Sequence, residues 1–317
     1  MGSQTLGIHH VTAIAGNPRQ NIDFYTGFLG LRLVKLTVNF DDPASYHIYY
    51  GDEVGHPGTI LTFFAWLGGP RGRLGAGQVV ATSFAIPEAS VDYWIERFRE
   101  HGVDFDGPTG RFGRDVIAFS DPDGLRLELV AGSPRTGVIP WEESPVPPEH
   151  ATLGFHSITM AERGLQGTES LLVGTMGFRR AGEEEGRVRY ETSSDAAGRI
   201  VELLPSAEQR PGRVAAGTVH HVAWRADGDE EQRAWRQQLA ALGTDVTQVA
   251  DRKYFHSIYF HEPGGVLFEI ATNPPGFTVD EPERELGTRL MLPSWLEPVR
   301  LKIERSLPPL HGMRRAA

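Results

Sequence analysis

Four stretches of the chain alternate apolar and polar residues and then continue with apolar residues at helical spacing. The first, LGIHHVTAIAGN at Leu6–Asn17, is followed by Ile22 and Phe28 on one face of a predicted helix. Asn17 is a favourable N-cap for this helix, and Pro18 fits its first position. The pattern therefore predicts a β-strand that leads directly into an α-helix.

The same opening recurs at three further places, so the chain contains an internal repeat. It begins at Gly77 with GQVVATSFAIPE, at Leu153 with LGFHSITMAERG and at Gly217 with GTVHHVAWRADG. The units are roughly 70 residues long, a length typical of one supersecondary repeat. The second and fourth predicted helices carry apolar positions that stop before a glycine: Val91, Trp94, Ile95 and Phe98 before Gly102, and Trp235, Leu239 and Leu242 before Gly243.

Each helix is followed by β-rich runs with turn residues between them. Val116–Gly132 and His256–Thr272 each contain two such runs, divided by Asp-Pro-Asp-Gly and Glu-Pro-Gly-Gly turns. A unit of one strand, one helix and further antiparallel strands cannot close a core alone, so it must pair with a sister unit. We therefore expect an α+β fold of four βαβββ repeats that form two paired-module barrels.

The repeats also predict how the chain is divided. Residues 1–131 hold the first two modules, and residues 152–272 hold the third and fourth. Residues 132–151 between them are rich in proline and serine, which is typical of a linker. We expect the tail, residues 273–317, to pack on the body because it carries large apolar residues. These are Phe277, Leu290, Leu292 and Trp295.

Composition narrows the possible chemistry and partners. The 317 residues are 40% hydrophobic and 23% charged, include no cysteine and carry a formal net charge of -10. A chain without cysteine has neither disulfides nor thiolate zinc sites. Scattered Lys and Arg in an acidic chain argue against a nucleic-acid partner. No basic signal region is visible and no apolar run approaches ~18 residues, so we expect neither export nor membrane insertion. We therefore expect a cytoplasmic protein.

The candidate metal site starts from Glu269, a carboxylate within the apolar run GGVLFEIATN. Burying a carboxylate in a strand is costly unless a cation compensates its charge. His10 and His221, from two of the repeat openings, complete a set of two histidines and one carboxylate. This set suits non-haem Fe(II), with coordination positions left open for oxygen and substrate.

Aligning the four repeats shows which units can form this site. The first-strand position is occupied in order by His10, Ala81, Ser157 and His221, and the last-strand position by Thr62, Glu128, Glu202 and Glu269. Only the first unit paired with the fourth gives two histidines and a carboxylate. We therefore expect an active barrel from the two ends of the chain and an inactive barrel from its middle. Sequential pairing would instead leave a site of His221, Glu269 and Glu202.

A single strand histidine is more often a hydrogen-bonded structural residue than a ligand. Two His-His pairs at equivalent places in a repeat, matched to a carboxylate in an apolar strand, favour ligation here. The first histidine of each pair, His9 or His220, points to the other face of its strand and is also explained as a packing residue. Glu128 and Glu202 have no histidine to join, so we expect them to be outward-facing or ion-paired.

Several of these features resemble one known family. The fourfold repeat, the HHV openings, the FEIA strand and the LPSWLEP tail resemble the vicinal oxygen chelate superfamily of glyoxalases, bleomycin-resistance proteins and extradiol dioxygenases. Within it, the chain is similar to hydroquinone-type ring-cleaving dioxygenases. The resemblance implies an Fe(II) enzyme, with Mn, Zn or Ni as alternative metals on isolation. Such an enzyme inserts O2 into a small aromatic diol, substituted or chlorinated hydroquinones included, and we expect a dimeric or tetrameric homo-oligomer.

The resemblance also implies roles for residues around the metal. It places His9, His220 and Thr12 beside the metal ligands, where they orient ligands or oxygen. Arg252 matches the family's pocket arginine, which stabilises the phenolate. Tyr259 matches its tyrosine, which acts as an acid/base group or a hydrogen-bond donor.

Two other functions remain open. A lyase or isomerase of the glyoxalase or epimerase kind would use the same fold with Zn, Ni or Co and enolate chemistry. Such sites usually carry a second carboxylate where this chain has Thr62. A metal-free ligand-sequestering resistance protein is the other alternative, and it would lack the ligand set that this chain retains.

Overall fold

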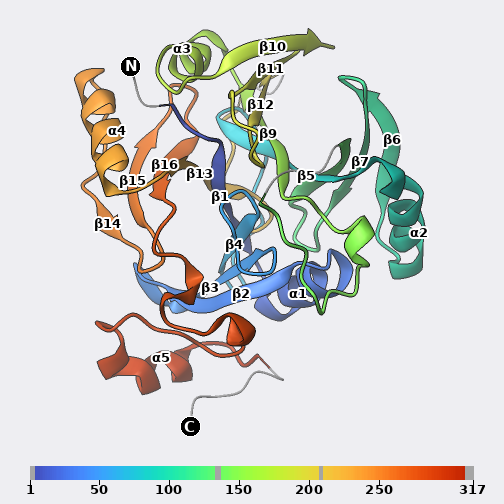
Figure 1. Cartoon of the computed structure of the whole chain (residues 1–317). Helices are drawn as coiled ribbons and strands as arrows, with labels where there is room; N and C mark the ends of the chain where they lie inside the picture. The colour runs from blue at the N-terminus through green and yellow to red at the C-terminus, as the bar shows by residue number, and fades with distance from the viewer. Residues whose placement is uncertain (1–3, 133–136, 207–209, 311–317) are drawn as a thin grey trace.

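The computed structural model describes residues 4–132, 137–206 and 210–310, which form two eight-stranded sheets (Figure 1). The strand order is β14-β15-β16-β13-β1-β4-β3-β2 in the first sheet and β10-β11-β12-β9-β5-β8-β7-β6 in the second. The first sheet thus joins the first and fourth repeats, and the second sheet joins the second and third. The predicted pairing is confirmed, and the sequential alternative is wrong.

Every repeat contributes four strands. The first sheet comprises β1 (Ile8–Ala15), β2 (Arg32–Asn39), β3 (Asp42–Gly51), β4 (Ile60–Ala65), β13 (Val219–Ala226), β14 (Ala250–Asp251), β15 (His256–His261) and β16 (Leu267–Thr272). The second comprises β5 (Gln78–Pro87), β6 (Phe105–Arg111), β7 (Arg114–Ser120), β8 (Arg126–Gly132), β9 (Phe155–Glu162), β10 (Arg179–Glu184), β11 (Arg187–Glu191) and β12 (Ile200–Pro205). Two repeats meet through antiparallel first strands, β1 with β13 and β5 with β9. Residues of these first strands therefore lie at the centre of each sheet.

One helix follows the first strand of each repeat. The helices are α1 (Pro18–Ile22), which continues as a π-helix over Asp23–Phe28, then α2 (Val91–His101), α3 (Gln166–Gly174), α4 (Asp229–Ala241) and, in the tail, α5 (Arg300–Ser306). Short 3-10 turns cover Glu88–Ser90, Pro148–His150, Phe277–Val279, Glu283–Glu285 and Glu297–Val299. The chain is therefore an α+β fold of four βαβββ units, as predicted.

Local chemistry sets the helix ends. The side chain of Asn17 accepts hydrogen bonds from the backbone N–H groups of Arg19 and Gln20, as an N-cap does. Gly102 ends α2 in the left-handed region, with φ of 62°, where a residue without a Cβ is favoured. Leu242 follows the end of α4 and is largely exposed, so its predicted place on the apolar helix face is wrong. The chain already turns there, because its N–H bonds back to carbonyls of the last turn.

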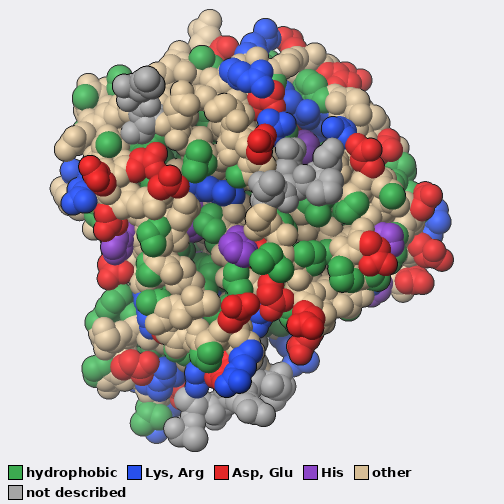
Figure 2. All heavy atoms as spheres, in the orientation of Figure 1, with side chains coloured by type: hydrophobic (Ala, Val, Ile, Leu, Met, Phe, Trp, Pro, Cys, Tyr) green, Lys and Arg blue, Asp and Glu red, His purple; other side chains and the backbone are tan. Residues whose placement is uncertain are grey.

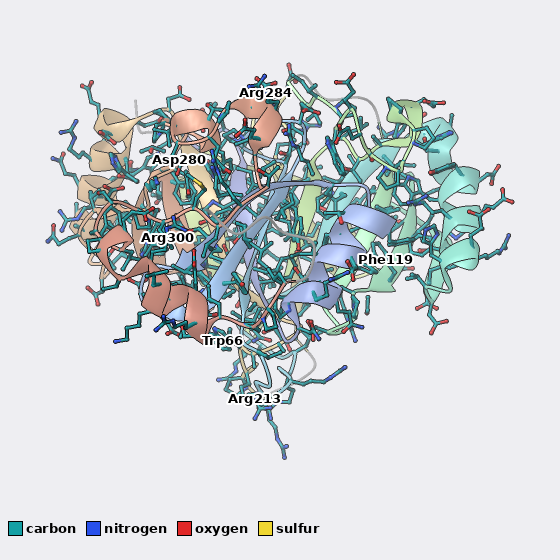
Figure 3. All side chains as sticks on the ribbon, turned by 90° about the horizontal axis from the view of Figure 1, so that it is seen from below. Trp66, Phe119, Arg213, Asp280, Arg284 and Arg300 are labelled. Atoms are coloured by element: carbon teal, nitrogen blue, oxygen red, sulfur yellow. The ribbon has the colours of Figure 1, made fainter. Side chains whose placement is uncertain are left out.

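The C-terminal segment packs across the strands of the first repeat. Lys35 on β2 is fully buried, and its Nζ contacts the carboxylates of Asp280, at 2.7 Å, and Glu281. Figure 3 labels Asp280 on this segment, which crosses the strands of the first repeat, drawn in blue. Trp295 is about half exposed, but its ring packs edge-on against Phe40 with centroids 5.7 Å apart. A buried ammonium held by two carboxylates therefore anchors this segment.

Charged side chains of both signs are interspersed over the face shown in Figure 2. No helix in the described ranges has the length and apolar character needed to span a membrane. Of the expected linker, residues 133–136 lie outside the described residues.

Candidate metal centre

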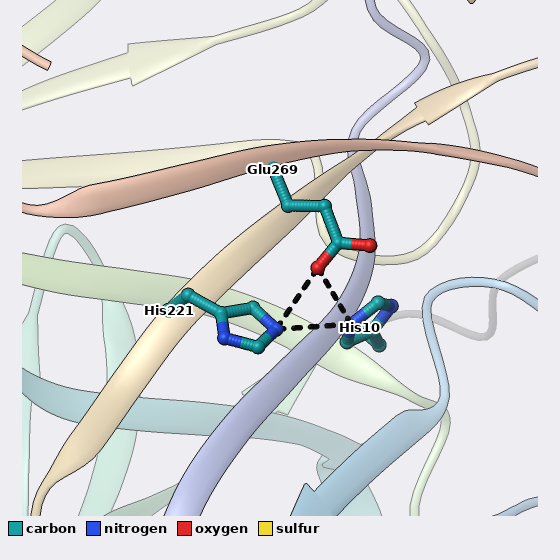
Figure 4. A group of neighbouring side chains, drawn as sticks. All are labelled: His10, His221 and Glu269. Atoms are coloured by element: carbon teal, nitrogen blue, oxygen red, sulfur yellow. Dashed lines mark hydrogen bonds and ion pairs between the residues drawn. The ribbon is translucent and has the colours of Figure 1, made fainter. Parts of the chain in front are cut away.

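His10, His221 and Glu269 converge at the centre of the first sheet (Figure 4). Oε2 of Glu269 lies 2.9 Å from Nε2 of His221 and 3.4 Å from Nε2 of His10. The two Nε2 atoms are 3.4 Å apart, and all three side chains are buried. Among the described residues, this is the one group of three ligand-type side chains close enough to share a metal ion.

Strand register explains why these three side chains meet. Ala223 on β13 is the register partner of His10 on β1 and also of Glu269 on β16, so the three lie in a row across adjacent strands. His221 lies two residues before Ala223 and therefore shares its face of the sheet. The small side chain of Ala223 leaves the space into which the three longer side chains project.

His9 and His220 lie at two β-bulges. The pairing of β1 with β13 skips His9 on one strand and His220 on the other, and a bulge residue is free to turn away from the regular alternation. Nδ1 of His9 lies 2.9 Å from Nδ1 of His10, and Nδ1 of His220 lies 2.8 Å from Nδ1 of His221. When His10 and His221 donate in these contacts, their Nε2 atoms keep a lone pair directed at the centre.

Burial also keeps the two bulge histidines neutral. It lowers the pKa of His9 well below its ordinary value, and the neighbouring His10 adds to this effect. It lowers the pKa of His220 to about 3. Both residues therefore contact the inner histidines as uncharged rings, with one acceptor nitrogen each.

The charges of the triad fit a bound cation. Burial alone would raise the pKa of Glu269, but His10 and His221 outweigh burial and hold the pKa well below its ordinary value. The ionised Oε1 accepts a hydrogen bond from Ser257 Oγ, whereas the buried Oε2 has no neighbour of this kind among the described residues except the imidazole nitrogens of His10 and His221. A carboxylate oxygen and two imidazole nitrogens at this spacing repel one another unless a cation or a proton lies between them. The donor set therefore fits a divalent metal ion.

A cavity of about 330 Å³ opens over the triad. Its walls are largely aromatic and apolar and include Phe40, Phe64, Trp66, Phe255 and Leu267. Asn39, Asp41, His47 and Tyr49 add polar groups from the first repeat. The cavity has the size and character of a site for one small aromatic molecule.

Arg252 and Tyr259 both line this cavity beside the triad. Arg252 Nε donates to the Tyr259 hydroxyl oxygen at 3.1 Å, and its Nη1 contacts Asp41 Oδ2 at 3.0 Å. Burial and the Glu269 carboxylate raise the pKa of Tyr259 above its ordinary value. The phenol thus stays protonated and accepts from the guanidinium, which leaves its own proton for another acceptor.

Thr12, which the resemblance placed beside the ligands, lies two residues after His10 on β1 and opposite His221 in the register, and it does not line the cavity. Its Oγ1 is 3.1 Å from Thr62 Oγ1, and both side chains are fully buried. Thr62 occupies the fourth corner of the centre, opposite Thr12 in the β1–β4 register. No carboxylate from the first repeat therefore reaches the triad at this corner.

The sequence reasoning missed His47 and Tyr49, two cavity residues on β3. A signal was present, because HIYY at 47–50 matches SIYF at 257–260, which contains Tyr259. His256 contacts Asp229, and His261 is exposed at the end of β15, so neither lines the cavity.

In the second barrel, the buried glutamates at the last-strand positions form ion pairs with arginines rather than with histidines. Glu128 is paired with Arg111, and Glu202 contacts Arg187 and Arg189. Arg111 also lies 3.7 Å from Glu202. The expectation of ion-paired glutamates is confirmed, but both side chains are buried, so the outward-facing alternative is wrong.

The sequence matches the glyoxalase/bleomycin resistance protein/dioxygenase superfamily over residues 7–129 and 152–270. The chain belongs to this superfamily. The two matched segments correspond to the two halves of the repeat array. The family thus accounts for most of the chain and for both barrels.

Full-length relatives of the chain are named as dioxygenases. MhqO of Bacillus subtilis, a proposed ring-cleaving dioxygenase, is 46% identical over 312 residues, with 98% of both chains covered. The chlorohydroquinone/hydroquinone 1,2-dioxygenase of Sphingobium indicum is 33% identical, with 95% of both chains covered. A crystal structure of a proposed dioxygenase from Bacillus subtilis superposes with a TM-score of 0.94 at 45% identity, over 99% of this chain and 100% of that one. Maize glyoxalase I, at 16% identity and a TM-score of 0.60 over 84% and 92% of the two chains, shares the fold alone.

Proposed function

We propose that the chain is an Fe(II)-dependent ring-cleaving dioxygenase that acts on hydroquinone-type diols. The observation that carries this proposal is a buried triad of two histidines and one glutamate beneath a ring-sized cavity. Position 62 is a threonine and not a carboxylate, so a metal ion at the centre would keep one more coordination position free for O2 or substrate. This favours an oxygenase over a lyase. The name of the Sphingobium relative supports a para-diol as the substrate class.

His10, His221 and Glu269 would hold the metal ion. Fe(II) bound by two imidazoles and one carboxylate supplies open coordination positions for O2 and a phenolate oxygen, and the electrons for oxygen activation. His9 and His220 would fix the tautomer and the orientation of the two ligand histidines from behind.

Arg252 and Tyr259 would bind and orient the substrate oxygen. The guanidinium is held by Asp41 and Tyr259, so it presents a fixed positive charge to a phenolate. The Tyr259 hydroxyl keeps its proton and directs it away from Arg252, which suits a donor to an oxyanion that forms during ring opening. The apolar walls would exclude water from the reacting ring.

The positions of the two hydroxyl groups in a para-diol restrict which ring bond can be cleaved. The two hydroxylated carbons of a hydroquinone are not adjacent, so the broken bond joins one of them to a neighbour that lacks a hydroxyl. Insertion of both oxygen atoms across this bond gives one carboxylic acid and one aldehyde, with no other reductant. The proposed reaction is therefore of the extradiol type.

Oxygen uptake by the Fe(II)-loaded protein tests the proposal. Methylhydroquinone should consume one O2 per diol and yield a ring-opened product, whereas the same protein without metal should consume none. Catechol in place of methylhydroquinone tests the para preference. A loaded protein that takes up no O2 with any diol, but isomerises a thiohemiacetal with Ni or Co, would overturn the assignment.

A further inference from the structure

The first and fourth repeats place equivalent residues around the metal centre. On the fourth-repeat side, Tyr259 of β15 is the register partner of Glu269 on β16. On the first-repeat side, Tyr49 of β3 is the register partner of Thr62 on β4. The two tyrosines are thus counterparts, and Thr62 is the counterpart of the glutamate.

The residue two positions before each tyrosine contacts the last-strand residue. Ser257 Oγ donates to Oε1 of Glu269. His47 Nε2 lies 2.7 Å from Thr62 Oγ1. His47 is therefore the counterpart of Ser257. In the first repeat an imidazole contacts the threonine, and in the fourth repeat a serine hydroxyl donates to the glutamate.

The hydroxyl of Thr62 is enclosed by two neighbours at this corner. Its hydroxyl lies between His47 Nε2, at 2.7 Å, and Thr12 Oγ1, at 3.1 Å, and its side chain is fully buried. A longer side chain at position 62 would have to displace at least one of these two neighbours, and His47 is the one that lines the cavity over the triad. The imidazole consequently closes the corner at which a fourth protein ligand would enter.

His47 is itself fixed in place. The Tyr49 hydroxyl lies 2.9 Å from its Nδ1, so both ring nitrogens are engaged. The imidazole packs between the rings of Tyr49, at a centroid distance of 4.0 Å, and Phe64, at 4.3 Å. Burial, with the nearby His10 and His221, lowers the pKa of His47 well below its ordinary value. A neutral ring with both nitrogens engaged, and with Tyr49 and Phe64 packed against it, offers the cavity mainly its carbon edge.

We propose that His47 is a positioning residue of the metal centre, with two effects on an aromatic diol. It keeps the fourth corner free of protein ligand and of ordered water, so that the open metal positions are left for the diol and O2. Its carbon edge also forms part of the cavity wall against which the diol ring packs. This proposal rests on the proposed function for the identity of the ligand.

The test uses two readouts that do not require turnover. The first is the visible spectrum of the Co(II)-loaded protein, which reports the number of ligands on the metal. The second is the anaerobic affinity for methylhydroquinone, followed by tryptophan fluorescence. His47→Ala should weaken diol binding about 3- to 10-fold, the effect of one lost aromatic contact. It should also lower the Co(II) absorption, because water enters the opened corner.

Two variants separate positioning from general damage. His47→Gln offers an amide to Tyr49 and Thr62, so it should restore the Co(II) spectrum while it regains only part of the diol affinity. Thr62→Val keeps the volume but removes the hydroxyl that His47 contacts, and it should weaken diol binding with little change in melting temperature. His256→Ala removes a histidine outside the cavity and serves as the matched control.

A His47→Ala protein with wild-type diol affinity and an unchanged Co(II) spectrum would overturn the proposal, as would losses no larger than those of His256→Ala. If His47→Ala does not fold, the Thr62→Val measurement decides by the same criteria. A wild type that binds methylhydroquinone but consumes no O2 refutes the dioxygenase function and leaves the role of His47 intact. A wild type that binds no diol refutes both.

Discussion

Replacing Glu162 with glutamine should make the protein more stable at alkaline pH. Glu162 ends β9 in the third repeat and is fully buried, and in the charged form neither of its oxygens has a hydrogen-bond donor among the described residues. Glu262, just after β15 in the fourth repeat, accepts from Thr168 Oγ1 at 2.6 Å and from the N–H groups of Gly264 and Val266, both at 2.9 Å. These three donors stabilise Glu262 as the ionised carboxylate. The two glutamates therefore share one proton, and Glu162 carries it.

The magnitude follows from the pKa of Glu162. Burial, and then the negative charge of Glu262, raise this pKa to about 8. An ordinary glutamate has a pKa of about 4.3, and each unit of difference corresponds to about 1.36 kcal/mol. The folded state therefore binds more protons than the unfolded state between these two values. The free energy of unfolding falls as pH rises through this window, by at most roughly 5 kcal/mol from this pair.

Glutamine at position 162 removes this titration and supplies a permanent N–H donor to Glu262. We expect Glu162→Gln and wild type to differ by about 1 kcal/mol or less at pH 5, where the wild-type carboxyl is already protonated. At pH 9 the variant should be more stable by roughly 2–5 kcal/mol, which corresponds to a melting temperature higher by several degrees. Thermal unfolding of both proteins in the same metal-loaded form at pH 5, 7 and 9 measures the difference.

Glu100→Gln, at an exposed position of α2, is the matched control and should show no such pH dependence. A difference between Glu162→Gln and wild type that is the same at pH 5 and pH 9 would contradict the reasoning. So would a variant that is less stable than wild type at pH 9, because glutamine would then be a worse partner for Glu262 than the ionised carboxylate.

Three further predictions concern the two barrels. Glu269→Gln should weaken Fe(II) retention at least tenfold without loss of the fold, measured as metal per protein after dialysis, since the amide keeps the shape but not the charge. Tyr259→Phe should lower kcat on methylhydroquinone about 10²-fold or more with a smaller change in diol affinity, because a proton donor acts mainly in the transition state; equal losses in both would contradict this role. Arg111→Met should lower the free energy of unfolding by about 3–5 kcal/mol at pH 7, since it leaves Glu128 buried with Ser83 as its one remaining hydrogen-bond donor among the described residues; adding Glu128→Gln should recover part of this loss in urea titrations.

The sequence was sufficient for the architecture and for the triad because ligand chemistry restricts both. Glu269 in an apolar run requires a cation, and only the first and fourth repeats supply histidines at the aligned positions. The pairing of the first repeat with the fourth, and of the second with the third, agrees with that prediction. Two helix ends were also predictable from single residues. Asn17 caps the start of α1 with its side chain, and Gly102, which has no Cβ, takes the left-handed conformation that ends α2.

Other features depend on register, which the apolar pattern does not encode. The bulges that turn His9 toward His10 and His220 toward His221 appear only when β1 is paired with β13. His47 was missed because the repeats were aligned on their first and last strands, and its role depends on the third strand of the unit. The contacts of Lys35 join positions that are far apart in the sequence, and no local pattern links them.

The two barrels answer the same electrostatic problem in different ways. The first barrel buries one last-strand glutamate and the second buries two, and a buried carboxylate needs a positive partner. In the second barrel, arginines on neighbouring strands supply that charge through fixed guanidinium contacts, as Arg187 and Arg189 do for Glu202. In the first barrel, the residues nearest Glu269 are histidines and Ser257, none of which carries a permanent charge. Arginine would satisfy Glu269 but would fill the centre, whereas two neutral imidazoles leave room for an ion with open positions. The same fold therefore gives a cluster of ion pairs in the second barrel and, in the first, a buried triad beside a cavity whose donor set fits a metal ion.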